Sequence, residues 1–299
     1  MSRREKMLKR DLVNAIKKGG GSFKTVSDYS KILQRVGSRL AALNIQINSV
    51  RQIKVRHVEL YMDSRKNDGV ANRTLQNEMT AIRRALDLSG KTMMADPKHE
   101  RLSNKALGIA GGSRKGTKEA ITDSRYREVL ERVQQVDKGV AAAMQLSRYL
   151  GLRNEEAVQS AKSLKTWQKA LMRGDNKLQV IFGTKGGRAR MTTVVDRPKV
   201  LEAVNNALSH CEKQNGKLIE KSELKSALNH YINVLRRNGG LTGRKETPHS
   251  LRYSYARDAM HFHIANGYSY KEALALTSMD LGHGDGRGTY IENVYCQKM

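Results

Sequence analysis

The stretch Thr247-Pro248-His249-Ser250-Leu251-Arg252 predicts the start of a helix. Thr247 suits the N-cap, and Pro248 suits the first helical position, where its missing N–H has no helical partner to lose. His249 and Arg252 then lie three residues apart on one face, close to the free N–H groups that attract anions. The pair therefore indicates a phosphate-binding point, although His-x-x-Arg alone also fits an exposed basic helix.

Two further motifs follow in the same part of the chain, Leu281-Gly282-His283 and Tyr295. Together with the first pair they supply two imidazoles, a guanidinium and a phenol. A phenol can attack a phosphodiester if neighbouring groups take its proton and hold the phosphate. The set therefore indicates DNA strand cleavage without a metal ion.

The chain is strongly basic along its whole length. Its 299 residues include 55 Lys and Arg against 29 Asp and Glu, which gives a formal net charge of +26 and a pI near 10.2. This excess predicts a polyanionic partner. No run approaches the ~18 continuous apolar residues of a membrane span, so no membrane association is expected.

The cysteines and the first residues predict a cytoplasmic protein. Cys211 and Cys296 are the only two cysteines, and they form neither a disulfide framework nor a zinc pattern. The basic start Ser2-Arg3-Arg4-Glu5-Lys6 lacks the apolar core of a signal peptide. His261 and His263 lie two apart in an expected helix, without a carboxylate or thiol at ligand spacing, so no metal site is expected there.

Apolar spacing predicts a compact helical bundle over residues 1–95. Its helices are indicated by three stripes: Tyr29, Ile32, Leu33, Val36, Leu40 and Leu43; Val55, Val58, Tyr61 and Met62; and Leu75, Met79, Ile82 and Leu86. The segment 96–118 loses this periodicity and contains Asp96-Pro97 and Gly111-Gly112. Such breakers predict a linker.

Residues 119–299 are expected to form a second domain of mixed α/β type. Its first predicted elements are two helices, 122–136 and 140–150, and two strands, 178–182 and 190–195. The strands flank a glycine-bearing turn, which predicts a hairpin with Lys185 at its exposed tip. The expected fold class is therefore mainly α with a small β-hairpin.

Five motifs resemble, in order and context, those of the tyrosine recombinases, also called phage-type integrases. They are Gly151-Leu152-Arg153-Asn154-Glu155-Glu156, Lys185 on the hairpin, His249-x-x-Arg252, Leu281-Gly282-His283 and Tyr295. The resemblance covers nearly the whole chain: the helical bundle resembles the core-binding domain, and the remainder resembles the catalytic domain. It implies a site-specific DNA recombinase or integrase that needs no cofactor. The partners implied are double-stranded DNA, three further copies in a homotetramer on synapsed sites, and accessory DNA-bending proteins.

The resemblance also implies a role for each motif residue. Tyr295 would attack the phosphate and leave a 3′-phosphotyrosyl bond and a free 5′-hydroxyl. Arg153 and Arg252 would hold the non-bridging oxygens, because planar guanidiniums suit the charge of a phosphorane. His249 would help to remove the phenol proton, and Lys185 would protonate the leaving oxygen.

The spacing at the nucleophile departs from the family pattern. His283, implied to donate a hydrogen bond to the phosphate, is usually followed by the tyrosine nine residues later, whereas Tyr295 lies twelve residues on. Tyr290 is therefore an alternative nucleophile. We favour Tyr295, because the glycine-rich loop 284–288 can accommodate an insertion at little cost.

Several alternatives stay open at the level of sequence. Glu156 would either hold the Arg153 guanidinium in place or form a simple exposed ion pair with it. A non-catalytic, recombinase-like DNA-binding regulator and a type IB topoisomerase are the competing functions. A basic ribosome-associated protein is a more distant third.

Overall fold

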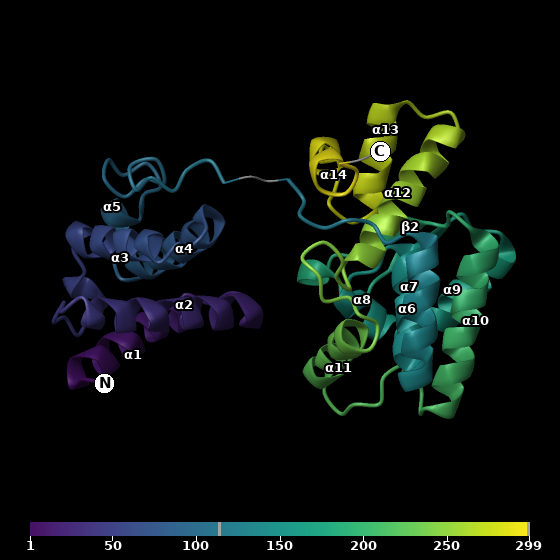
Figure 1. Cartoon of the computed structure of the whole chain (residues 1–299), viewed down its shortest axis with the longest axis horizontal. Helices are drawn as coiled ribbons and strands as arrows, with labels where there is room; N and C mark the ends of the chain where they lie inside the picture. The colour runs from purple at the N-terminus through teal and green to yellow at the C-terminus, as the bar shows by residue number, and fades with distance from the viewer. Residues whose placement is uncertain (113–114, 298–299) are drawn as a thin grey trace. The chain divides into compact units, whose positions relative to one another are not determined.

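The computed structural model describes residues 1–112 and 115–297. The chain forms two compact units, residues 1–113 and 114–299 (Figure 1). Each unit buries apolar side chains of its own. Residues 113 and 114, which fall within the linker expected at 96–118, lie outside the described residues.

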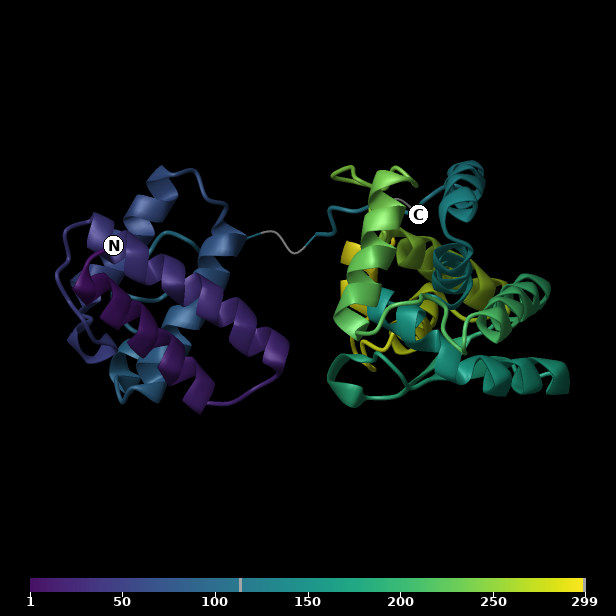
Figure 2. The same cartoon turned by 90° about the horizontal axis from the view of Figure 1, so that it is seen from below.

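The first unit is helical throughout its described elements. These are α1 (Arg3–Lys18), α2 (Phe23–Ala42), the 3-10 turn η1 (Val50–Gln52), α3 (Val55–Asn67), α4 (Asn72–Leu88) and α5 (Thr92–Ala95). The expected stripes form α2, α3 and α4, whereas α1 was not predicted. Its buried residues Leu8, Leu12 and Ile16 recur every four positions, and it packs beside α2 in both views (Figure 2).

The segment that follows α5 also packs onto this first core. Leu102, Leu107 and Ile109 are buried in it, and the Gln76 side-chain amide donates to the Ile109 carbonyl at 2.8 Å. The early part of the segment expected as a linker therefore belongs to the first unit. Its apolar residues lack a regular period, so sequence pattern alone did not reveal their burial.

The second unit is mainly helical with one hairpin, which confirms the expected fold class. Its elements are α6 (Asp123–Val136), α7 (Lys138–Leu150), α8 (Asn154–Gln159), η2 (Ser160–Ser163), α9 (Leu164–Arg173), β1 (Lys177–Val180), η3 (Lys185–Gly187), β2 (Arg190–Thr193), α10 (Arg197–Lys213), α11 (Leu224–Arg237), α12 (Ser250–Ala265), α13 (Tyr270–Asp280) and α14 (Gly288–Val294).

The central helix of this unit is α7, which is buried on most of its surface and packs against α6, α10 and α12. It ends at Gly151, whose φ of +58° lies in the left-handed region. A Cβ at this position would stand 2.4 Å from the Tyr255 ring. Glycine is therefore required on both grounds, and the turn that it makes leads directly to Arg153.

The hairpin pairs β1 and β2 in antiparallel register, with Lys177 opposite Thr193 and Val180 opposite Arg190. Lys185 lies at its exposed tip, as expected. The adjacent Gly186 has a positive φ, and a Cβ there would meet no atom within 4 Å. The tip therefore stands in open space.

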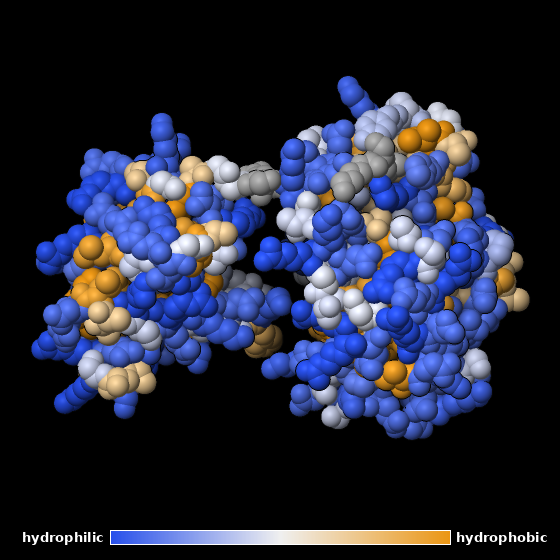
Figure 3. Space-filling view, viewed as in Figure 1, coloured by the Kyte–Doolittle hydropathy of each residue, from blue (hydrophilic) through white to orange (hydrophobic). Residues whose placement is uncertain are grey.

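The face of the molecule in Figure 3 is mostly hydrophilic, with small scattered apolar patches. This agrees with the high content of charged residues in the chain, 28%. Across residues 1–112 and 115–297, no helix combines the length and the apolar character needed to span a membrane.

The separate cores lead to a prediction about stability. Leu33 is fully buried in the first unit, and Leu146 is fully buried in the second. We expect Leu33→Ala to destabilise the first unit by about 2–5 kcal/mol, because it removes buried methyl groups and leaves a cavity. Amide hydrogen exchange will locate the loss, and Leu146→Ala is the matched control. A single substitution that lowers protection equally in both units would contradict separate cores.

Candidate active site

The start of α12 brings the first predicted pair together, although the helix begins later than expected. It starts at Ser250 with His249 at the N-cap position. Thr247 is not the cap: its backbone N–H donates to the Ser250 hydroxyl at 3.0 Å, and its own buried hydroxyl has no partner among the described residues. Pro248 lies in the preceding turn, so the expectation for both residues was wrong. The tight turn at 247–250 replaces the side-chain cap.

Tyr295 lies at the end of α14 and faces this pair. The residue is 5% exposed, and its hydroxyl is 3.2 Å from Nε2 of His283 and 3.5 Å from Nε of Arg252. The ring centroid of His249 is 6.3 Å from that of Tyr295. Residues from α12, α14 and the loop after α13 thus converge on one phenol.

Tyr290, the alternative nucleophile, occupies a different position on α14. It is 39% exposed, and its ring packs against His283 at a centroid distance of 4.9 Å, with the two ring planes tilted by 55°. Among the described residues its hydroxyl has no hydrogen bond. Tyr290 thus lies at the mouth of the site, whereas Tyr295 is held inside it.

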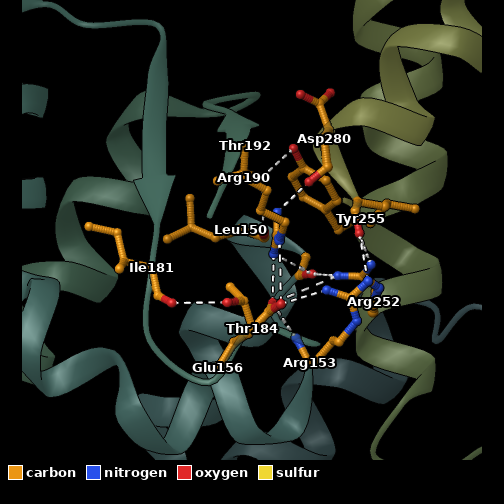
Figure 4. Close-up of polar contacts among 12 residues, drawn as sticks. Leu150, Arg153, Glu156, Ile181, Thr184, Arg190, Thr192, Arg252, Tyr255 and Asp280 are labelled. Carbon is orange, nitrogen blue, oxygen red and sulfur yellow. Dashed lines mark hydrogen bonds and ion pairs between the residues drawn. The ribbon is translucent and has the colours of Figure 1, made fainter. Parts of the chain in front are cut away.

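Glu156 is the carboxylate around which the arginines gather (Figure 4). Nη1 of Arg153 donates to its Oε1 at 2.6 Å, and Nη1 of Arg252 lies 3.9 Å from its Oε2. Glu156 is 1% exposed. The alternative of a simple exposed ion pair is therefore wrong, because this carboxylate is buried beneath the guanidiniums.

Two backbone carbonyls complete the cluster. The Leu281 carbonyl accepts from Nη2 of Arg153 at 3.0 Å and also from Nη2 of Arg252. The Gly151 carbonyl accepts from Nη1 of Arg252. Arg252 is 1% exposed, so these acceptors hold its guanidinium rigidly at the floor of the site.

Arg190 is a member of the cluster that the sequence analysis missed. It opens β2, is buried, and donates through Nη2 to Oε2 of Glu156 at 2.8 Å. An arginine at an inward position of a short, otherwise uncharged strand was the available signal. Such a residue is rarely buried unless it is paired.

Charge and burial shift the pKa values of these groups. Burial opposes ionisation of Glu156, but Arg190 and Arg252 outweigh it and lower its pKa to about 2. Burial, together with the nearby Arg190 and Arg153, lowers the pKa of Arg252 to about 10. Both groups are therefore charged at neutral pH.

The pKa values of the two histidines are lowered as well, but for these groups the shift favours the uncharged form. Burial and the neighbouring guanidiniums of Arg252 and Arg153 lower the pKa of His249 to about 4 and that of His283 to about 3. Both imidazoles are therefore neutral near pH 7 and able to accept a proton.

The site opens into a cleft of about 1080 Å³. Five of the six predicted site residues line it: Arg153, Lys185, His249, His283 and Tyr295. Lys185 reaches the cleft only from the exposed hairpin tip, while Arg252 lies below the surface of the cleft. Within the described ranges, no group of three or more His, Cys, Asp or Glu side chains is placed to hold a metal ion.

The histidine pKa values predict how stability depends on pH. Since both folded values lie below the ordinary 6.5, the unfolded chain binds protons more readily between pH 6.5 and about 4. We expect the free energy of unfolding to fall as the pH falls through this window, measured by denaturant unfolding. A His249→Gln/His283→Gln variant should show a shallower dependence. Imidazole NMR titrations with midpoints near 6.5 would contradict this picture.

Comparisons with known proteins agree with this architecture. A family model described as Integrase matches residues 108–258, just over half of the chain. A second, described as Phage integrase, N-terminal, matches residues 5–95. No curated protein matches the sequence. Arg153, Lys185, His249 and Arg252 fall inside the Integrase match, whereas His283 and Tyr295 lie beyond it.

Solved structures of integrases and recombinases share the fold. A lambda integrase dimer bound to a COC′ core site is 16% identical, with a TM-score of 0.56 over 93% of this chain and 74% of that one. The Tn1549 transposon integrase in complex with transposon right end DNA is 13% identical, with a TM-score of 0.57 over 95% of this chain and 94% of that one. XerH recombinase bound to palindromic difH is 14% identical, with a TM-score of 0.56 over 93% of this chain and 78% of that one. The chain therefore belongs to the integrase family of tyrosine recombinases, enzymes of site-specific DNA recombination.

Proposed function

We propose that this integrase cuts and rejoins DNA through a covalent bond between Tyr295 and the 3′ phosphate of the cut strand. One observation carries the proposal: the Tyr295 hydroxyl lies 3.2 Å from a neutral imidazole and 3.5 Å from a buried guanidinium. The first group can take the phenol proton. The second lies where negative charge would develop on the phosphate.

The chemical step balances without a cofactor. The Tyr295 O–H bond breaks, its proton passes to an imidazole, and the phenolic oxygen bonds to phosphorus. The bond from phosphorus to the 5′ oxygen breaks, and Lys185 supplies the proton that this oxygen needs. The covalent bond conserves the energy of the phosphodiester, so a 5′-hydroxyl can reverse the step.

The two imidazoles lie at different distances from Tyr295, and this suggests different roles for them. His283 lies within hydrogen-bond distance of Tyr295, so in the free protein it is the nearer acceptor for the phenol proton. The family resemblance gives this role to His249, whose ring centroid lies 6.3 Å from that of Tyr295 and which lines the same cleft. We propose that both flank the phosphate once DNA is bound.

The arginines supply the charge that stabilises the transition state. The Arg153 side chain is 23% exposed and lines the cleft, so its guanidinium can donate to a non-bridging oxygen. Arg252 is fixed beneath it by two carbonyls. Fixed donors of this kind require little reorganisation when charge develops.

The assembly is part of the same proposal. The net charge of +26 suits double-stranded DNA, and the described surface in Figure 3 is largely hydrophilic. One solved relative is a lambda integrase tetramer bound to a Holliday junction. We propose a homotetramer on synapsed sites, aided by accessory DNA-bending proteins. The two cysteines of the chain, both free and buried, suit the cytoplasm.

The nucleophile can be tested by trapping. A pool of nicked duplexes with a randomised core should yield a protein–DNA adduct, because the fragment beyond the nick diffuses away and prevents religation. We expect wild type and Tyr290→Phe to form the adduct and Tyr295→Phe to form none. Peptide mapping identifies the modified tyrosine, and the captured DNA identifies the site. Adduct on Tyr290, or no adduct from wild type, would overturn the assignment.

The role of Lys185 has a separate test. A thiolate leaves without protonation, so a substrate with sulfur at the 5′-bridging position does not need the acid. We expect Lys185→Ala to cleave ordinary DNA about 100-fold more slowly or worse and to cleave the sulfur substrate nearly as fast as wild type. Equal losses on both substrates would remove Lys185 from this role.

The competing functions predict different products from the same protein. A type IB topoisomerase would relax supercoiled plasmid that lacks any selected site, whereas a recombinase would join two duplexes only when both carry it. A non-catalytic DNA-binding regulator would form no adduct at all.

A further inference from the structure

We propose that Arg190 is a positioning residue for cleavage: it offsets the negative charge of Glu156, so that Arg153 and Arg252 keep an excess of positive charge for the phosphate. This inference rests on the proposed function. The Arg190 side chain is 4% exposed and opens β2, five residues after Lys185. Arg190 is among the residues that line the cleft, but its side chain is buried and its guanidinium is directed to acceptors inside the protein.

Every nitrogen of the Arg190 guanidinium has an acceptor inside the protein. Nη2 donates to Oε2 of Glu156 at 2.8 Å and to the Gly151 carbonyl at 3.1 Å. Nη1 donates to the Asp280 carbonyl, and Nε lies 3.5 Å from Oε1 of Glu156. A guanidinium held in this way acts through the groups that it holds and not by contact with substrate.

The charge balance shows what Arg190 contributes. Three guanidiniums surround one carboxylate, which leaves a net charge of +2 for the phosphate. Without Arg190, the remaining cationic partners of Glu156 in the described cluster would be Arg153 and Arg252. The carboxylate would then compete with DNA for the two groups that must bind the phosphate.

Arg190 also fixes the backbone segments whose carbonyls bind the Arg252 guanidinium. It shares the Gly151 carbonyl with Arg252, and it holds the Asp280 carbonyl next to Leu281. A Cβ on Gly282 would stand 2.6 Å from Cδ of Arg190, so this glycine leaves room for the side chain. The backbone at residues 280–282, just before His283, therefore packs against the Arg190 side chain.

The test removes the charge of Arg190 and then removes the charge that it neutralises. With a nicked duplex recovered from the randomised pool, we expect Arg190→Gln to form the covalent adduct about 100-fold more slowly than wild type. Its DNA affinity should change little, whereas its melting temperature should fall, because a buried ion pair of Glu156 is lost; the rates are therefore compared at a temperature at which both proteins are folded. The double variant Arg190→Gln/Glu156→Gln should recover at least about 10-fold over the single variant, because no carboxylate then draws Arg153 away. A merely structural role would instead make the double variant worse.

Two further variants keep the test decisive. Arg190→Lys preserves the positive charge, so we expect its rate to stay within about 10-fold of wild type. Arg197→Gln is the matched control, since Arg197 also donates to backbone carbonyls of this unit but lies outside the cleft. It should cleave like wild type.

The outcomes separate this inference from the proposed function. If wild type forms no adduct, the proposed function fails. If wild type cleaves and Arg190→Gln cleaves equally well, only the role of Arg190 is overturned. That role is also overturned if the double variant gains nothing, or if a folded Arg190→Lys loses much more than 10-fold. Should Arg190→Gln fail to fold, Arg190→Lys alone decides.

Discussion

The buried carboxylate of Glu156 is the interaction on which the site depends. It gathers guanidiniums from three places far apart in the chain: Arg153 before α8, Arg190 on β2 and Arg252 on α12. An unpaired charge at this depth would be very unfavourable, so each of these elements must reach its place for the others to be stable. The three cations exceed the one anion, and a DNA phosphate would reduce the excess.

The same positive charge governs the histidines. It disfavours protonation of His249 and His283, whose pKa values fall to about 4 and about 3. An imidazole that would often be partly charged near neutral pH is thereby kept as a proton acceptor. Phosphate binding and neutral imidazoles are therefore two effects of one arrangement: the field proposed to attract the substrate also keeps both histidines uncharged, and the negative charge of a bound phosphate would raise their basicity.

Sequence pattern predicted much of this architecture and missed what depends on long-range contacts. The stripes of α2, α3 and α4 and the hairpin were predictable because their periods are local. The short segment around Leu102, Leu107 and Ile109 has no such period, so its packing was not visible. The prediction that Thr247 caps α12 was wrong, because the residues at 247–250 form a turn instead. Local hydrogen bonding of this kind can move the start of a helix by one or two residues.

In the site, too, some residues were predicted from local motifs and others were not. Ordered motifs pointed to the six residues, and the structure brings five of them to one cleft with Arg252 just beneath. The burial of Glu156 and the part played by Arg190 could not be predicted, because both follow from the packing of β2 against α13 and the turn at Gly151. A charged residue in a strand signals a partner, but it does not say which one.

The proposed nucleophile Tyr295 and the proposed acid Lys185 have very different surroundings in the free protein. The groups around the Tyr295 hydroxyl, the proposed attacking oxygen, are buried and held by contacts. The ring centroids of Tyr295 and Tyr253 are 4.5 Å apart, and Arg252 donates hydrogen bonds to two carbonyls. Lys185 lies instead on an exposed turn, where a Cβ added to the neighbouring Gly186 would meet no atom within 4 Å. In terms of the proposed mechanism, the free protein is organised for attack on phosphorus but not for protonation of the leaving oxygen. Ordering the hairpin against bound DNA would complete the site, which ties strand cleavage to correct engagement of the substrate.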